Sequence, residues 1–138
     1  MRRIGLSLLI PYLFMVIVAT LVLRTPSEDR EIMLIPFQTF KEALTNDFWE
    51  FEIQANILLF IPIELFLSMS LNRAKFLPLI IGTLFSAAIE IVQLLTHRGT
   101  FEINDLISNF FGDLVGFIIY QPFRILAHMD KGYKSNRL

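Results

Sequence analysis

The sequence predicts an all-α membrane domain with four transmembrane helices and most of its polar chemistry at one end. Hydrophobic residues make up 54% of the 138 residues, which is more apolar surface than a soluble domain of this length can bury. Charged residues make up only 18%, below the roughly 25% usual in soluble domains. The apolar residues also gather in stretches of about 20, the length that a helix needs to cross a bilayer core. We therefore expect residues 1–138 to form a single polytopic membrane domain.

The composition also excludes several classes of function. The chain has no cysteine, which excludes disulfides, thiolate zinc sites and a cysteine nucleophile. Its net charge of -1 provides no basic surface for nucleic acid. The two histidines, His97 and His128, lie far apart in the sequence and do not have the spacing of a metal-binding pair. We therefore expect no metal, no cofactor and no nucleic-acid partner.

The first expected span covers residues 4–23 and contains no charged side chain. Arg2 and Arg3 precede it, as basic residues do in a cleaved signal peptide. However, the apolar stretch is longer than the roughly 7–15 residues of a signal core, and no clear small-x-small cleavage site follows it. We interpret this segment as an uncleaved signal anchor.

Residues 24–52 form the expected outer loop, which contains one amphipathic stretch. Pro36 interrupts any continuous helix through this loop. After it, apolar residues recur at helical spacing on an otherwise polar segment: Phe37, Phe40, Leu44 and Phe48. We expect a short helix lying in the outer interface, with Trp49 at the depth of the lipid headgroups. The alternative is a solvated linker.

The other three expected spans cover residues 53–71, 76–96 and 106–126, and the basic residues around them predict their orientation. One side of the membrane would carry eight Lys and Arg residues: Arg2, Arg3, Arg73, Lys75, Arg124, Lys131, Lys134 and Arg137. The other side would carry four: Arg24, Arg30, Lys41 and Arg98. Since cytoplasmic loops carry the excess of basic residues, both termini are expected in the cytoplasm.

The polar residues of the last three spans are expected to converge in the outer half of the bilayer. A rise of about 1.5 Å per residue places six of them toward the outer end: Asn56, Glu90, Gln93, Arg98, Asp105 and Asn109. Helical spacing gives one shared face to Gly82, Ser86, Glu90 and Gln93, and another to Asp105, Asn109, Gly112 and Gly116. Small residues in such a row let helices approach closely. The pattern predicts either a ligand pocket open to the outer leaflet or a network that only holds the helices together.

Two acids lie deeper than this cluster. Glu64 is expected near mid-membrane, and Asp113 roughly 12 Å below the outer end of the fourth span. An ionised carboxylate in hydrocarbon costs from about 2.5 kcal/mol upward. No Lys or Arg lies within two helical turns of either acid along the chain. We therefore expect the protonated form, which can donate a hydrogen bond inside the bundle.

Several fragments, taken in order, resemble one family of bacterial membrane proteins. They are Pro36-Phe37, Asn56–Pro62 (NILLFIP), Glu90–Gln93 (EIVQ), Arg98, Ile103–Gly112 (INDLISNFFG) and Gly116. This set resembles the VanZ-like family over about residues 35–120. The motif positions carried over are Asn56, Phe60, Pro62, Glu90, Gln93, Arg98, Asp105, Asn109, Gly112 and Gly116. The resemblance assigns Pro62, Gly112 and Gly116 to helix packing and the polar positions to the candidate pocket.

The resemblance implies a multi-pass protein of the bacterial cytoplasmic membrane. The founding member of the family is associated with low-level resistance to teicoplanin, a glycopeptide that acts on cell-wall precursors, and the family carries no established reaction. This chain departs from the family pattern at Glu64 and Asp113, where relatives usually carry small or apolar residues. These two acids could share a proton, or could form a cation or proton site specific to this chain.

Three hypotheses of function follow. In the first, the outer pocket binds an envelope lipid, a cell-wall lipid precursor or a glycopeptide, with Arg98 holding an anionic headgroup. In the second, a membrane enzyme acts on a lipid-linked substrate with Glu90 and Asp105 as acid and base, although the chain offers neither a metal set nor a nucleophile. In the third, a small proton-coupled transporter uses Glu64 and works as a dimer. The first, with membrane lipids as partners and no catalytic residue, is our leading interpretation.

Overall fold

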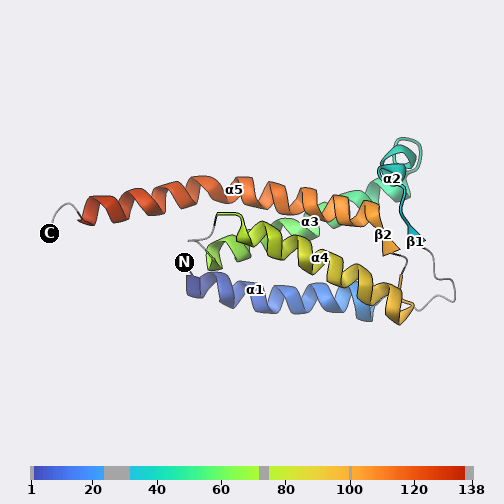
Figure 1. Ribbon diagram of the computed structural model, residues 1–138, viewed down its shortest axis with the longest axis horizontal. Helices are drawn as coiled ribbons and strands as arrows, with labels where there is room; N and C mark the ends of the chain where they lie inside the picture. The colour runs from blue at the N-terminus through green and yellow to red at the C-terminus, as the bar shows by residue number, and fades with distance from the viewer. Residues whose placement is uncertain (1, 24–31, 72–74, 100, 136–138) are drawn as a thin grey trace.

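The chain folds into an elongated helix bundle, shown as a computed structural model in Figure 1. The structure describes residues 2–23, 32–71, 75–99 and 101–135, with side chains as far as residue 126. The long helices are α1 (Arg2–Ile17), continued by the π-helix η1 (Val18–Val22), then α3 (Asp47–Ser70), α4 (Leu77–Thr96) and α5 (Ile103–Ser135). The expected all-α fold is confirmed.

Three helices in the described part of the chain are long and apolar enough to cross a membrane: Arg2–Val22, Asp47–Ser70 and Leu77–Thr96. They match the first three expected spans, although α3 begins at Asp47 and not at residue 53. The fourth expected span, residues 106–126, lies within α5, which is not one of these three helices. The chain is thus a membrane protein with several candidate membrane-spanning helices.

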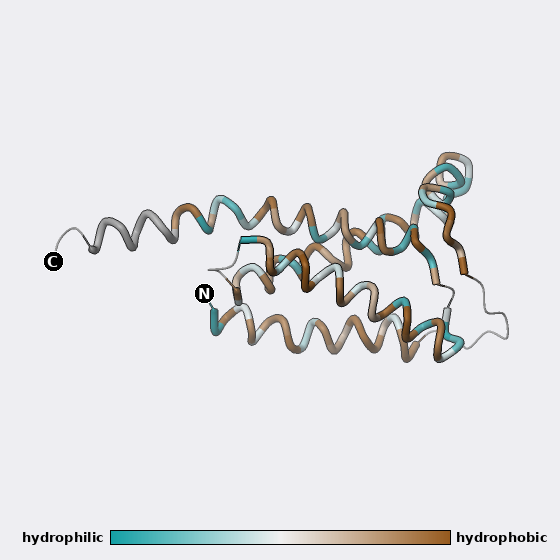
Figure 2. Tube along the Cα trace, viewed as in Figure 1, coloured by the Kyte–Doolittle hydropathy of each residue, from teal (hydrophilic) through white to brown (hydrophobic). Residues whose placement is uncertain are grey.

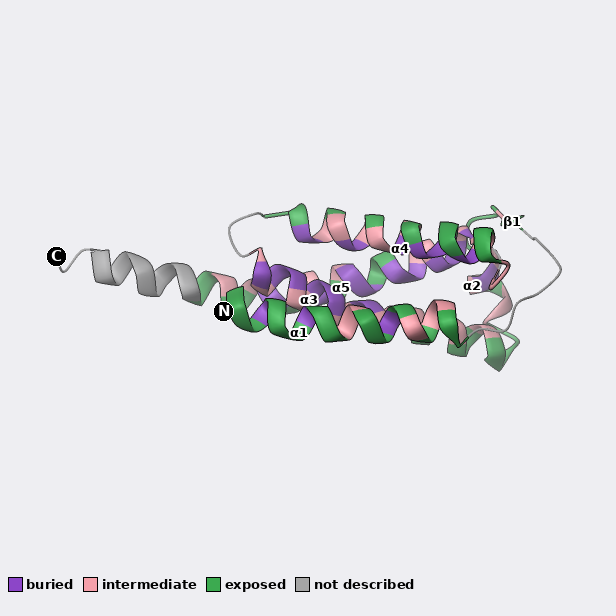
Figure 3. Cartoon of the chain, turned by 90° about the horizontal axis from the view of Figure 1, so that it is seen from below, coloured by how far each residue is buried: buried purple, intermediate pink, exposed green. Residues whose placement is uncertain are grey.

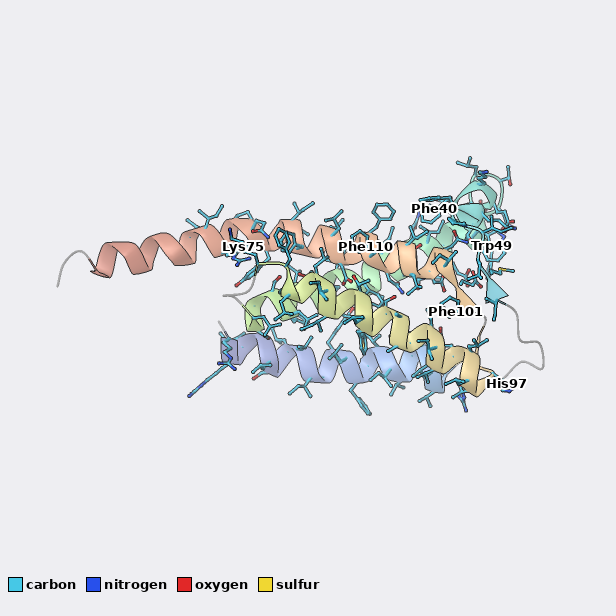
Figure 4. All side chains as sticks on the ribbon, viewed as in Figure 1. Phe40, Trp49, Lys75, His97, Phe101 and Phe110 are labelled. Carbon is cyan, nitrogen blue, oxygen red and sulfur yellow. The ribbon has the colours of Figure 1, made fainter. Side chains whose placement is uncertain are left out.

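The start of α1 and the end of α5 lie toward the same end of the bundle (Figure 1). Lys75 lies at this end too, where its carbonyl oxygen is 3.4 Å from Nη1 of Arg124 on α5 (Figure 4). Six of the other basic residues that predict the orientation lie outside the described residues or have no described side chain. They are Arg24, Arg30, Arg73, Lys131, Lys134 and Arg137.

Local signals set the ends of α3 and α4. The Asn46 side chain accepts a hydrogen bond from the Phe48 N–H at 3.0 Å and so caps the start of α3. Pro78 stands in the first turn of α4, where a backbone N–H has no helical partner to lose. His97 ends α4 with a left-handed φ of 56°, and the next N–H returns to the Gln93 carbonyl at 3.0 Å.

Two glycines set the close approach of α5 to α3, which run in the same direction. A Cβ added at Gly112 would collide with the Ile57 carbonyl oxygen and would lie 2.9 Å from the Phe60 Cβ. A Cβ added at Gly116 would lie 3.0 Å from the Glu64 Cβ. Since only hydrogen fits in these gaps, the two backbones pack against each other as in other small-residue helix contacts in membranes.

The apolar core lies between α1, α3 and α4. Its buried members are Leu9, Val16, Phe60, Ile63, Leu67 and Ile89. The Phe60 side chain is 1% exposed, and its ring centre lies 6.4 Å from that of Phe85. Exposed residues cover the outward faces of the helices, and many of them are apolar (Figures 2 and 3). A helix that is apolar both inside and outside is suited to lipid surroundings.

The segment before α3 differs from the single interfacial helix expected after Pro36. It contains only the short helix α2 (Gln38–Glu42), a turn, and then the capped start of α3 at Asp47. Trp49 therefore belongs to the first turn of α3, and the prediction of one separate helix through this stretch is wrong. The physical reason is the Asn46 cap, which starts a new helix inside the expected one.

A two-stranded parallel sheet, which the periodicity did not predict, also lies at this end. β1 (Ile32–Met33) pairs with β2 (Phe101–Glu102). The pairing joins two segments that α2, α3 and α4 separate in the sequence. Aromatic rings then fix the outer segment on α5, because the Phe40 ring centre lies 6.5 Å from that of Phe111. Figure 4 shows Phe40, Trp49, Phe101 and His97 at the end of the bundle opposite to Lys75.

Candidate functional site

Polar and small residues face each other in three steps across the contact between α4 and α5. We call this set the α4–α5 polar ladder; its members are Gly82, Ser86 and Glu90 on α4, Asp113 and Asn109 on α5, and Glu102 on β2. α4 and α5 run in opposite directions. Moving four residues toward the C-terminus of α4 therefore corresponds to moving four residues toward the N-terminus of α5. The ladder runs from mid-bundle to the end that carries β1 and β2.

The outermost step ties the sheet to α4. An oxygen of the Glu90 carboxyl accepts a hydrogen bond from the Glu102 backbone N–H at 3.2 Å. Glu90 is 2% exposed, and Asp105, in the first turn of α5, is also buried. The Glu90 carboxyl therefore has a structural partner in β2 and is buried at the end of the bundle that carries the sheet.

The middle step joins Asn109 to Ser86. Nδ2 of Asn109 donates to Oγ of Ser86 at 2.8 Å, and both side chains are buried. Oδ1 of Asn109 is also buried and has no donor among the described residues. A buried acceptor without a donor costs about 1–3 kcal/mol, so this oxygen marks a place where a ligand donor would stabilise the protein.

Two more amides at this end share that arrangement. Nδ2 of Asn104 donates to the Ile35 carbonyl at 3.1 Å, and Nε2 of Gln93 donates to the Thr20 carbonyl at 3.2 Å. In both residues the amide oxygen is buried and meets no donor within the described ranges. Each amide thus uses its NH2 group to hold another segment of the chain and leaves an acceptor unsatisfied inside.

Arg98 holds the end of the first helix. Its Nη1 donates to the carbonyl oxygens of Leu21 at 2.9 Å and Val22 at 2.7 Å, which are the last carbonyls of η1. A helix C-terminus carries partial negative charge and unpaired carbonyls, so a guanidinium there is stabilising. Gln93, which reaches Thr20, supports the same helix end.

Replacing Arg98 by glutamine is expected to loosen η1 without unfolding the bundle. Two hydrogen bonds at a partly exposed site contribute about 1 kcal/mol, so amide exchange at Leu21–Leu23 should become roughly fivefold faster. Hydrogen–deuterium exchange of the purified protein measures this. Arg124→Gln, at the other end of the bundle, is the matched control and should leave these amides unchanged. Unaltered exchange in Arg98→Gln would show that the cap contributes nothing.

The step of the ladder farthest from the sheet holds Asp113, and a second buried acid, Glu64, lies on the neighbouring helix α3. A Cβ added at Gly82 would lie 2.6 Å from one Asp113 oxygen, so the carboxyl lies directly against α4. Glu64 and Asp113 are both 0% exposed. One Glu64 oxygen accepts from Oγ of Ser68 at 2.9 Å. Its other oxygen and both Asp113 oxygens are buried without a hydrogen-bond partner in the described chain.

The structure gathers only some of the expected pocket residues in one place. Glu90, Asp105 and Asn109 lie along α4 and the outer part of α5, whereas Gln93 and Arg98 reach toward η1. Asn56 lies half-buried on α3, next to the Ile57 that contacts Gly112.

The sequence reasoning missed two features of this site. Asn104, which is 1% exposed and holds the Ile35 carbonyl, was not among the expected site residues. The contact of Gly82 with Asp113 was also missed. The sequence did contain a signal for the Gly82–Asp113 contact. Gly82 and Ser86 are four residues apart, as are Asn109 and Asp113, and the two expected helices run in opposite directions.

Comparison with known proteins gives one match. The family model described as VanZ/LLP1 matches residues 6–126, which is most of the chain and includes every residue of the ladder. No curated protein and no solved structure matches the chain.

Proposed function

This chain belongs to the VanZ/LLP1 family, and from that premise we propose that it binds a ligand of the bacterial envelope at the outer end of its bundle. The ligand class is a lipid-linked cell-wall precursor or a glycopeptide, and the protein would influence glycopeptide susceptibility. The site would be the buried outer part of the α4–α5 polar ladder together with the amides beside it.

The proposed topology places this site outside the cytoplasm. In it, α5 is a fourth transmembrane helix, and both termini are cytoplasmic. Arg2, Arg3, Lys75 and Arg124 support this, because they lie at the end of the bundle where α1 starts and toward which α5 ends, and basic residues favour the cytoplasmic side. The sheet and α2 would then lie at the outer face of the bacterial cytoplasmic membrane.

The observation that carries the proposal is the excess of buried acceptors at the outer end. The amide oxygens of Gln93, Asn104 and Asn109 are buried and without donors among the described residues, and the acids Glu90 and Asp105 lie beside them. A ligand that suits this set must bring O–H and N–H donors. Sugars and peptides have many, and a cell-wall precursor or a glycopeptide contains both.

The role of Arg98 differs in this proposal from the one that the sequence suggested. Its Nη1 donates to the η1 carbonyls, so we assign Arg98 to holding the first helix beside the site. The ligand is accordingly selected by its donors and not by a negative charge.

The test compares Asn109→Ala with a control on an exposed amide, Gln54→Ala, which lies at the outer end of α3. Loss of one acceptor should weaken binding of a glycopeptide or a cell-wall lipid precursor to the purified protein by about fivefold, or about 1 kcal/mol. In cells with matched membrane expression, wild type and Gln54→Ala should change glycopeptide susceptibility equally, and Asn109→Ala less. Identical susceptibility of wild-type and empty-vector cells, together with no binding by the purified protein, would refute the proposal.

A further inference from the structure

Three helices meet at the buried acids in the middle of the bundle. Asp113 of α5 lies against the backbone of Gly82 on α4, and Glu64 of α3 lies against Gly116 on α5, with its Cγ 3.4 Å from the position of an added Cβ. Gly116 lies three residues after Asp113 on α5, so the two acids stand about one helical turn apart along α5. Neither side chain has any exposed surface, so both are removed from water and from lipid headgroups.

The hydrogen bonds around these acids leave a clear deficit of donors. Of the four carboxyl oxygens, the described residues satisfy one, through the Ser68 hydroxyl. Two ionised carboxylates about one helical turn apart in a fully buried site would repel each other and lack compensation. One proton held between them removes one charge and supplies one missing donor at the same time.

The other described titratable groups on the elements packed around the acids supply no positive charge that would compensate two ionised carboxylates. On α4 the acid nearest in sequence to Gly82 is Glu90, two turns farther out, which accepts from β2. On α1 the Tyr12 hydroxyl donates to the Leu59 carbonyl at 3.1 Å. On α5 the Tyr120 hydroxyl lies two turns farther in, buried and without a partner in the described part of the chain. The first positive charge inward on α5 is Arg124, whose Nη1 reaches the Lys75 carbonyl.

The packing favours a proton over a larger ion. Calcium takes 6–8 oxygen ligands, and magnesium usually keeps several waters. Here the Asp113 carboxyl fills the space that a single methyl group on Gly82 would need, and the one described side-chain oxygen hydrogen-bonded to either acid is Oγ of Ser68, which donates to Glu64. A proton needs only two oxygens and no added volume.

The polar ladder connects this place with the outer end. From Asp113, the next step outward is the Asn109–Ser86 hydrogen bond, and the following one is the Glu90 carboxyl against β2. Steps of four residues are spaced by about 6 Å along each helix. The residues on α5 just inward of Gly116 are apolar, namely Phe117, Ile118 and Ile119.

We propose that Glu64 and Asp113 form a proton-binding site at the centre of the bundle, which exchanges protons with the outer face along the α4–α5 polar ladder. A proton from outer water adds to a carboxylate oxygen of the pair and leaves by the same route. The proton-binding residues Glu64 and Asp113 are distinct from those of the proposed ligand site, so the infrared test of the acids does not depend on that ligand; only the outward route shares Asn109 and Glu90 with it.

Infrared spectroscopy of the purified protein in lipid nanodiscs tests the site. The wild type should show the C=O band of a protonated carboxyl at neutral pH, and the band should shift when the solvent is changed to D2O. Asp113→Asn and Glu64→Gln should each lose the band, since an amide NH2 replaces the proton as donor to the remaining carboxylate. Glu50→Gln, an exposed acid on α3, should keep it. Circular dichroism establishes that these near-isosteric variants fold.

Two further measurements separate the proposal from its rivals. Asn109→Leu should slow the D2O shift of the band several-fold, whereas Ile118→Leu on an exposed face of α5 should not. Addition of sodium, potassium or calcium should leave the band in place. The proposal is overturned by a band that is absent from wild type, by a band that survives both acid substitutions, or by displacement of the band by one of these ions. An unchanged exchange rate in Asn109→Leu overturns the outer route.

Discussion

Replacement of Gly112 by valine is expected to abolish the stable bundle. The first added carbon would meet the Ile57 carbonyl oxygen and the Phe60 Cβ, and the two methyl groups would force α5 away from α3. Overpacking of this kind costs about 1–3 kcal/mol in a core that can adjust, and more where the obstacle is backbone. Because α3 and α5 share the most extensive helix contact among the described residues, displacing α5 would disrupt much of the packing of the bundle.

Alanine at the same position gives a sharper form of this prediction. In an ordinary helix, glycine to alanine stabilises by about 1 kcal/mol through helix propensity. At Gly112 the clash should exceed that gain and make the change destabilising. Denaturant titration in mixed micelles, followed by circular dichroism, measures both variants. Ala88→Leu, an exposed position on α4, should leave the midpoint unchanged. A Gly112→Ala variant more stable than wild type would contradict the close contact.

Truncation of Phe60 to alanine is expected to have the next largest effect. Its side chain is 1% exposed, belongs to the core shared by α1, α3 and α4, and stands at the level of Gly112. Removal of a buried phenylalanine side chain costs about 3–5 kcal/mol in soluble cores. We expect a value near the lower end, about 3 kcal/mol, because a separated helix in lipid already keeps its side chains away from water.

The matched control for Phe60→Ala is Leu58→Ala on the same helix. Leu58 is 65% exposed, so its truncation removes contacts with lipid and not with protein. The same denaturant titration should show a large decrease in midpoint for Phe60→Ala and almost none for Leu58→Ala. Equal losses in the two variants would mean that the core around Phe60 is not the main apolar contact of the bundle.

The sequence predicted the helices well because their signals are local. Runs of apolar residues located α1, α3 and α4. The four-residue spacing of Ser86 and Glu90 on α4, and of Asp105 and Asn109 on α5, indicated the faces that carry polar residues. The start of α3 was misplaced although its signal was present. Asn46 is a favoured helix cap, and it outweighed the apolar stripe that suggested a separate interfacial helix.

What escaped prediction depends on contacts between distant parts of the chain. The β1–β2 pair and the hydrogen bond of Asn104 to the Ile35 carbonyl each join residues about 69 positions apart. The hydrogen bonds of Arg98 to the end of η1 likewise join segments far apart in the sequence. Periodicity and composition describe one segment at a time, so neither can indicate which carbonyl a guanidinium will find.

The cap that Arg98 places on η1 has a consequence for biogenesis. Arg98 follows Leu21 by 77 positions, so the last carbonyls of the first helix are made long before their donor. During synthesis that helix end has to remain hydrated, or bound to the insertion machinery, until α4 has entered the membrane. The contacts that hold the end of the first helix therefore form only after Arg98 has been synthesised, so a residue made after α3 and α4 completes the first helix.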